Sequence, residues 1–331
     1  MPKGILERLA EGPVLGDGGY LLELEKRGYV QAGPFTPEVV IEHPDTLAQL
    51  HREFLRAGVD VLQTMTFYAS DDKLATVGLA GKVDEINRTA VRVARQVAAE
   101  GDALVAGNLS LTWAYAPDDP SSAGHVRELF DRQLEGQLDA GPPDFWIGET
   151  FSYLGEALLF VERARATGLP VVVTMSFEQP APRSYEGDTP AGCARRLRDA
   201  GADVVGVNCL NGPEQQLPIA LEMRAAVDGF VAAQPVAYRT TAERPDFTSL
   251  PNFPYELDPL QLSRVEMAEF ARRANEGGID YIGSCCGSVQ VHVRAMAKAI
   301  GKLPSEEREW KTGSGRAMSA YEYHAHTETE V

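Results

Sequence analysis

The chain has 331 residues, 44% of them hydrophobic, and 31 Lys and Arg against 48 Asp and Glu give a formal net charge of −17 at pH 7. This acidic balance excludes a protein that grips a nucleic-acid backbone through basic patches. No apolar stretch reaches the roughly 18 residues of a membrane span, and the N-terminus lacks the apolar core of a secretion signal. We therefore expect a cytoplasmic protein, not bound to membranes, whose cysteines stay reduced.

One unit recurs along the chain: a short β-branched run, a turn, and an amphipathic stretch of helical period. Eight such runs predict strands at residues 13–17, 59–67, 103–110, 144–151, 170–177, 203–210, 235–240 and 279–286. Helices that follow or link them are predicted at residues 45–57, 83–99, 125–140, 155–167, 213–227 and 263–276.

Eight alternating units predict an α/β protein whose residues 1–305 form a single domain, a (β/α)8 TIM barrel, followed by a short polar tail at residues 306–331. The alternative is an open doubly wound sheet. It would need a GxGxxG turn after the first strand, which residues 16–19 (GDGG) do not supply.

Three of the four cysteines stand where a predicted strand ends: Cys209, Cys285 and Cys286. Barrel active sites lie at the carboxyl ends of the strands, so these thiols could be neighbours in space. Three thiolates can hold a zinc ion and leave its fourth position open to a substrate. Buried core cysteines or a strained disulfide are the alternatives. Cys193, in the first turn of an amphipathic helix, is expected in the core.

Other strand ends carry polar groups: Asp17 after the first run, Tyr68 after the second and Glu149 in the fourth. Carboxylates in a barrel mouth can hold an ammonium group through charge-assisted hydrogen bonds. Asp17 could instead be a turn residue before Gly18, and Glu149 a salt-bridged residue that fills the barrel.

Eight short segments between residues 12 and 315 carry a resemblance. They are residues 16–19 (GDGG), 24–30 (LEKRGYV), 33–38 (GPFTPE), 51–58 (HREFLRAG), 66–74 (TFYASDDKL), 206–209 (GVNC), 234–238 (QPVAY) and 285–287 (CCG). Together they resemble the homocysteine S-methyltransferase family. The CCG segment together with GVNC is specific for the family, and residues 68–74 narrow the resemblance to its betaine–homocysteine branch.

The resemblance implies a zinc-dependent barrel in which Cys209, Cys285 and Cys286 bind the metal and carry catalysis, with the homocysteine sulfur as fourth ligand. It also implies that Asp17, in the turn with Gly18, and Glu149 contact the amino group of homocysteine. Tyr68 and Phe35 match aromatic positions near the methyl donor.

A methyl group on a quaternary nitrogen or a sulfonium already has a neutral leaving group, so attack by sulfur needs no general acid. This explains how the chain could catalyse without an HExxH or Ser-His-Asp arrangement. Aromatic faces can hold the onium donor through cation–π attraction. The candidates are Phe35, Tyr68, Trp113 and Tyr115; the last two lie beyond the third strand, in a loop that could close over the site or simply pack there.

Two departures bear on the donor: Phe35 stands where animal relatives carry a tryptophan, and Thr150 where they carry a tyrosine. We expect glycine betaine as donor, giving methionine and dimethylglycine. The sulfonium donors dimethylsulfoniopropionate and S-methylmethionine remain alternatives.

The polar tail differs from the long dimerisation arm of animal relatives, so any homo-oligomer would use another surface. Two other classes stay open: a zinc hydrolase on the same barrel, and a non-catalytic barrel braced by zinc.

Overall fold

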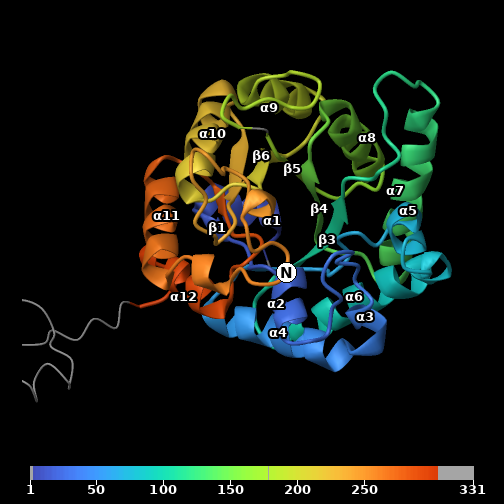
Figure 1. Cartoon of the computed structure of the whole chain (residues 1–331), viewed down its shortest axis with the longest axis horizontal. Coiled ribbons are helices and arrows are strands. Elements are labelled where there is room, and N and C mark those ends of the chain that lie inside the picture. Colours follow the sequence, from blue (N-terminus) through green and yellow to red (C-terminus); the bar gives the residue numbers. More distant parts are fainter. Residues whose placement is uncertain (1–2, 178, 305–331) are drawn as a thin grey trace, which may run out of the picture.

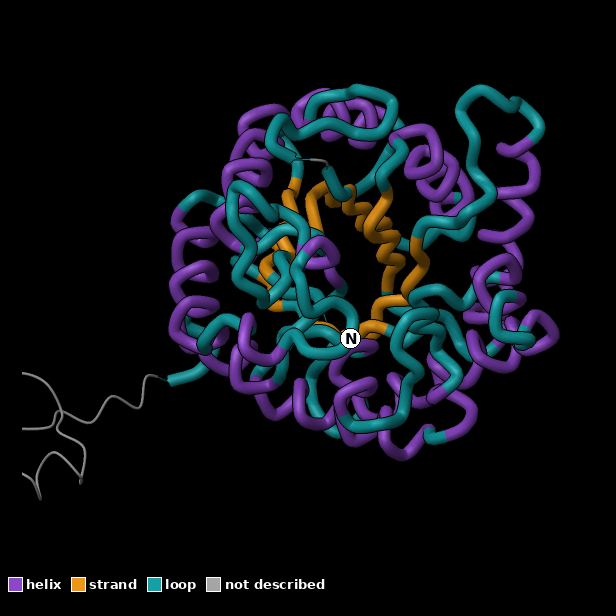
Figure 2. The backbone as a smooth tube through the Cα atoms, in the orientation of Figure 1, coloured by secondary structure: helices purple, strands orange, loops and turns teal. Residues whose placement is uncertain are grey.

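Eight parallel strands form one sheet in the computed structural model, which describes residues 3–177 and 179–304. The sheet curls into a central ring that helices enclose (Figures 1 and 2). The strand order is β1-β8-β7-β6-β5-β4-β3-β2. The strands are β1 (Val14–Leu15), β2 (Val61–Gln63), β3 (Leu104–Ser110), β4 (Phe145–Phe151), β5 (Val171–Met175), β6 (Val204–Asn208), β7 (Phe230–Gln234) and β8 (Tyr281–Ile282). The predicted TIM barrel is confirmed.

Most strands are followed by a helix on the outside of the ring, as alternating β/α units require. The helices are α1 (Ile5–Glu11), α2 (Leu21–Lys26), α3 (Val39–Glu42), α4 (Pro44–Ala57), α5 (Asp71–Ala75), α6 (Val83–Ala98), α7 (Ser122–Asp139), α8 (Leu154–Arg165), α9 (Pro190–Asp199), α10 (Pro213–Ala226), α11 (Arg264–Glu276) and α12 (Gln290–Ala299). Short 3-10 turns lie at Ala80–Lys82, Phe247–Ser249 and Asp258–Leu260. None of the helices in the described part of the chain is long and apolar enough to cross a membrane.

Alternate side chains of the strands point into the barrel and toward the helices, because successive residues of a strand face opposite sides. Val61, Phe145 and Val204 belong to the interior cluster. Ile5 and Leu9 of α1 join the same cluster and close the amino-terminal end of the barrel. This packing leaves the carboxyl ends of the strands as the open end, where the candidate site lies.

Asp60 links the first and second strands. Its backbone N–H donates to the carbonyl of Leu15 at 2.9 Å, and its Oδ2 accepts from the backbone N–H of Leu15 at 2.7 Å. These two hydrogen bonds connect β1 and β2, which are the two ends of the strand order and are not joined by a β ladder.

The seventh strand lies earlier than predicted. It spans Phe230–Gln234, whereas residues 235–240 follow it toward the site. The prediction was wrong because Pro235 has no N–H to donate to a ladder and therefore ends the strand instead of beginning it. The predicted tail, residues 306–331, lies outside the described residues.

Candidate active site and metal centre

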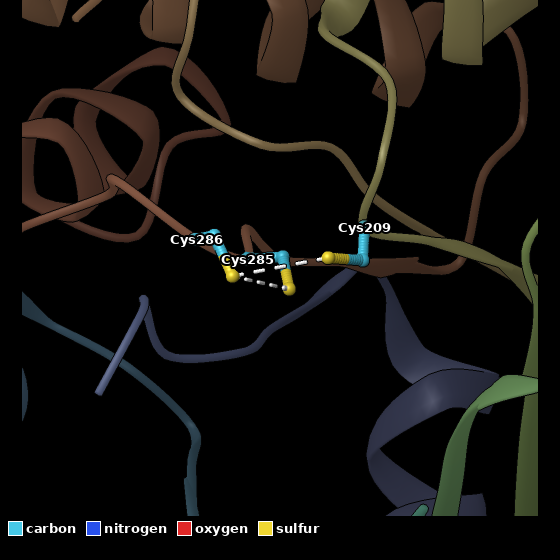
Figure 3. A group of neighbouring side chains, drawn as sticks. All are labelled: Cys209, Cys285 and Cys286. Atoms are coloured by element: carbon cyan, nitrogen blue, oxygen red, sulfur yellow. Dashed lines mark hydrogen bonds between the residues drawn. The ribbon is translucent and has the colours of Figure 1, made fainter. Parts of the chain in front are cut away.

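Three cysteine sulfurs meet at the carboxyl end of the barrel (Figure 3). The Sγ atom of Cys286 lies 3.8 Å from that of Cys209 and 3.9 Å from that of Cys285, and all three sulfurs lie within 4.8 Å of one another. Cys209 is the residue after β6, and the other two follow β8. Cys193 is also placed as expected, buried in the core away from this cluster.

Backbone hydrogen bonds to the seventh strand's loop fix these positions. The N–H of Cys209 donates to the carbonyl of Gln234 at 2.9 Å, and that of Cys285 donates to the carbonyl of Pro235 at 2.8 Å. The loop after β1 also packs closely here: a Cβ atom on Gly19 would lie 2.8 Å from the carbonyl oxygen of Cys285, so only glycine fits.

The sulfur arrangement fits zinc. Bonds of about 2.3 Å in tetrahedral geometry place neighbouring sulfurs about 3.8 Å apart, which is the spacing found for two of the three pairs. The Cys209 thiol beside it, together with burial, raises the pKa of Cys285 well above its usual range. Three thiols held this close would therefore stay protonated at neutral pH without a positive ion among them, and a dication would supply the missing charge.

Asp17 and Glu149 are both buried near the cysteines. Asp17 Oδ2 accepts from the backbone N–H of Gln63 at 2.7 Å and from the Tyr20 hydroxyl, and its Oδ1 accepts from Gln63 Nε2 at 3.1 Å. Burial raises the pKa of Asp17 to about 6 against the opposing effect of these hydrogen bonds.

Two asparagines hold Glu149. Asn108 Nδ2 donates to its Oε1, and Asn208 Nδ2 donates to its Oε2 at 3.0 Å. Burial raises the pKa of Glu149 to about 7. Asn208 is oriented in turn by Thr150, whose backbone N–H donates to Asn208 Oδ1 at 2.8 Å and whose hydroxyl accepts from Asn208 Nδ2 at 2.8 Å. Thr150 therefore positions Asn208, and through it Glu149.

A cavity of about 70 Å³ extends between Glu149 and the thiols of Cys285 and Cys286. Its lining includes Gly18, Gly19, Tyr20, Gln63, Asn108, Glu149, Cys285 and Cys286. Gly18 lies against Phe54, with room for no Cβ atom: one would lie 2.7 Å from that ring. The Glu149 carboxylate and the two thiols on the lining of this cavity suit a ligand with an ammonium group and a sulfur atom.

The predicted aromatic residues divide into three groups. Tyr68 and Trp113 have ring centroids 6.1 Å apart. Phe35 packs 6.3 Å from Phe253, in the cluster that also contacts Cys285 and Cys286. Tyr115 lies elsewhere: its ring is 5.4 Å from Tyr153, and its hydroxyl donates to Glu186 at 3.2 Å. The structure brings Tyr68 and Phe35 to the thiols' surroundings but does not bring Tyr115 to them.

Tyr68 lies close enough to the cysteines for their charges to act on it. Burial, and then the proximity of Cys209, Cys286 and Cys285, raises the pKa of Tyr68. Its neighbour on the other side is Lys73, whose Nζ stands 3.8 Å from the Tyr68 ring centroid and 4.2 Å from that of Trp113. This ammonium is buried and has no hydrogen-bond partner among the described residues. The Lys73 amino group thus already occupies the space between the Tyr68 and Trp113 rings.

Left-handed backbone marks the same end of the barrel. Among the described residues, positive φ outside glycine occurs at Phe35, Tyr68, Thr150, Cys209 and Leu210. Such conformations cost of order 1–3 kcal/mol each and persist where the surrounding structure holds them, often at functional sites. Four of the five are residues already singled out: Cys209 for the metal, Phe35 and Tyr68 for the donor, and Thr150 for its hydrogen bonds to Asn208.

Several site residues escaped prediction from the sequence: Tyr20, Gln63, Lys73, Asn108, Asn208 and Phe253. Three of these are polar residues within or at the end of strands whose residues are all buried, namely Gln63 in β2, Asn108 in β3 and Asn208 in β6. A polar amide in a buried strand of a barrel is a usable signal for a hydrogen bond to a site residue. Phe253 and Lys73 gave no comparable local signal.

Comparison with known proteins gives these features a context. The family model described as homocysteine S-methyltransferase matches residues 14–300. Betaine–homocysteine S-methyltransferase 1 of Bos taurus is 44% identical over 96% of this chain and 80% of its own length, and that of Danio rerio is 45% identical over 96% and 81%. S-methylmethionine–homocysteine S-methyltransferase of Pongo abelii is 41% identical, covering 96% of this chain and 88% of its own length.

Among solved structures, the metallated form of the homocysteine methyltransferase MmuM from Escherichia coli superposes with a TM-score of 0.71 at 20% identity, covering 88% of this chain and 98% of that one. This likeness supports the barrel fold. The family match over residues 14–300 and the relatives more than 40% identical make this chain a methyltransferase. The chain belongs to the homocysteine S-methyltransferase family.

Proposed function

We propose that this protein binds zinc through Cys209, Cys285 and Cys286 and transfers a methyl group from an onium donor to homocysteine. The sulfur spacing of 3.8 and 3.9 Å carries the proposal, because it matches a tetrahedral zinc site with one position left for a substrate. Zinc at this site would hold the homocysteine sulfur as a thiolate. The thiols it needs stay reduced in the cytoplasm, where we place the protein.

The buried carboxylates bind the other end of homocysteine. Glu149 lines the cavity that reaches Cys285 and Cys286, and Asp17 is buried against Tyr20 and Gln63 of the same lining. A protonated amino group between the two carboxylates would satisfy two acidic groups whose burial is otherwise costly. The Asn108 and Asn208 amides fix the Glu149 carboxylate, and Tyr20 and Gln63 fix that of Asp17, so the amino group finds its acceptors already oriented.

The donor binds on the opposite side, against aromatic faces. Tyr68 and the pair Phe35 and Phe253 are aromatic side chains near the thiols. With glycine betaine, the sulfur attacks a methyl carbon, the C–N bond breaks with its electron pair moving to nitrogen, and the products are methionine and dimethylglycine. The nitrogen leaves neutral, so no proton donor is needed at that step.

S-methylmethionine is the second donor to consider, because a relative named for that donor is 41% identical to this chain. In that reaction the C–S bond of the sulfonium breaks, and both products are methionine. The aromatic faces would accept either cation, so they do not decide between the two donors.

The test is to incubate reduced, zinc-loaded protein with homocysteine and glycine betaine as the one methyl source. Methionine and dimethylglycine in equal amounts are expected. No product with this donor but methionine with S-methylmethionine would reassign the donor. No product with any onium, on protein that retains zinc, would overturn the proposal.

A further inference from the structure

Tyr20 links the Asp17 carboxylate to a buried histidine. Its hydroxyl donates to Asp17 Oδ2 and lies 3.1 Å from His51 Nδ1. The Tyr20 ring also packs on its neighbours, with centroids 5.1 Å from His51 and 5.3 Å from Phe54. Tyr20 lines the cavity that Glu149, Cys285 and Cys286 also line, whereas His51 lies behind Tyr20 in α4.

The directions of these hydrogen bonds follow from counting protons. A tyrosine hydroxyl has one hydrogen, which goes to Asp17, so His51 Nδ1 must be the donor to the Tyr20 oxygen. Burial lowers the pKa of His51 to about 3, so its neutral ring carries only that one N–H. His51 Nε2 then needs no acceptor, and it indeed has no partner among the described residues. His51 therefore donates to Tyr20, and Tyr20 donates to Asp17.

These hydrogen bonds determine which acceptor position of the Asp17 carboxylate is free. A carboxylate has about four acceptor positions. Oδ2 is filled by the Tyr20 hydroxyl and the Gln63 backbone N–H, whereas Oδ1 receives only Gln63 Nε2. One position on Oδ1 remains for an ammonium group, and rotation of the carboxylate away from it would break the bonds to Oδ2.

We propose that Tyr20, held by His51, is a positioning residue that fixes the charged Asp17 carboxylate for the amino group of homocysteine. The inference rests on the proposed function, in which Asp17 receives that amino group. The selectivity for a thiol with an α-amino group would then depend partly on the Tyr20 hydroxyl, which contacts neither the thiol nor the methyl group.

The test compares two thiols: homocysteine and 4-mercaptobutanoate, which lacks only the amino group. Calorimetric binding of each to zinc-loaded protein needs no methyl donor. Both thiols meet the cysteine site alike, so the ratio of their affinities isolates the amino-group contact. In Tyr20→Phe we expect this ratio to fall about 10-fold, as for the loss of a hydrogen bond to a charged group. Affinity for 4-mercaptobutanoate should stay within about 2-fold.

Tyr281→Phe is the matched control. The Tyr281 hydroxyl is also buried in the barrel beside Asp17 but has no partner among the described residues, so its removal should leave the ratio unchanged. An unchanged ratio in Tyr20→Phe would overturn the inference. So would an equal loss for both thiols, because that pattern indicates a merely structural tyrosine.

The pH dependence gives a second readout. The Tyr20 hydrogen bond lowers the pKa of Asp17 against burial, so its loss should move the acidic weakening of homocysteine binding to higher pH. The other titratable groups facing Asp17 are Tyr281 and Glu149. Tyr281 stays neutral throughout, and Glu149 titrates in both proteins, so the difference between them reports on Asp17. An unmoved profile would contradict the inference.

These outcomes are separable from the proposed reaction. Product formation tests methyl transfer, whereas the affinity ratio tests the amino-group contact without a donor. If the wild-type protein forms methionine but the affinity ratio is unchanged in Tyr20→Phe, the inference is wrong and the proposed reaction still stands.

Discussion

The Sγ atoms of Cys209 and Cys286 lie 3.8 Å apart although 77 positions separate these residues in the chain. Closure of the barrel brings β6 and β8 to either side of β7, and each strand delivers its thiol at the same end. Removal of either thiol should leave at most two sulfur ligands. We expect Cys286→Ser to lose more than about nine-tenths of its zinc, because a serine hydroxyl is a poor ligand for zinc beside thiolates.

The measurement is metal content by mass spectrometry together with methyl transfer and thermal unfolding. Cys193→Ala is the control, since Cys193 is buried in the core and burial raises its pKa to about 12. It should keep one zinc per chain and full turnover. If Cys286→Ser kept its zinc, the proposed three-sulfur site would be wrong. If Cys286→Ser lost both zinc and thermal stability while the wild-type protein showed no turnover, zinc would only stabilise the barrel.

Asp17 and Glu149 should set the acidic limb of homocysteine use. Burial raises their pKa values to about 6 and about 7, so both lose their charge as the pH falls through this range. An ammonium group binds the charged forms, and KM for homocysteine should therefore rise as the pH falls from 8 to 5.5. In Asp17→Asn we expect KM to be raised about 10- to 100-fold at pH 8.

The donor KM serves as the internal reference for that experiment, because the proposed donor site is formed by aromatic side chains and includes neither carboxylate. Glu85→Gln, an exposed change in α6, should behave like the wild type. Equal increases of both KM values in Asp17→Asn would indicate a disturbed barrel instead of a lost amino-group contact.

The sequence predicted those parts of the fold that local patterns determine. Buried parallel strands appear as apolar runs, and their ends mark the site, so Cys209, Asp17 and Glu149 could be picked out by position. The seventh strand was misplaced because two apolar runs flank Pro235, and only the missing N–H of proline tells which of them belongs to the sheet.

Local sequence patterns could not predict which side chains contact each other across the barrel. Nothing near Lys73 in the sequence shows that its ammonium lies between Tyr68 and Trp113, since Trp113 comes from the loop after β3. The separation of Tyr115 from Trp113 has the same origin. Trp113 and Tyr115 are two residues apart in one loop but pack on different neighbours. The position of Tyr115 depends on Tyr153, just before α8, and on Glu186, which accepts from the first residue of α8.

Tyr68 should contribute to donor binding through its ring more than its hydroxyl. A cation–π contact of about 0.5–2 kcal/mol predicts that Tyr68→Leu raises KM for the donor about 2- to 30-fold. Tyr68→Phe keeps the aromatic face and should stay within about 3-fold of the wild type. Initial rates at saturating homocysteine measure both. Equal defects in the two variants would show that the hydroxyl, and not the face, holds the donor.

Lys73 should make the stability of the protein depend on alkaline pH. Burial lowers the pKa of Lys73 from 10.5 to about 7, and an unfolded chain restores the higher value. Between these values the unfolded state binds a proton that the folded state does not, so the free energy of unfolding rises with pH and the cost of the buried ammonium is fully present below about pH 7. Wild-type protein should gain roughly 2–4 kcal/mol from this group between pH 7 and 10.

Lys73→Met removes the titrating group while keeping an unbranched side chain against the Tyr68 and Trp113 rings. Denaturant unfolding of both proteins at pH 7 and pH 9.5 gives the comparison, and every other titration cancels in the difference. We expect the wild type to gain on the variant as the pH rises. Parallel changes in the two proteins would mean that Lys73 keeps its ordinary pKa, and that its ammonium stays charged between the two rings throughout the working range of the enzyme.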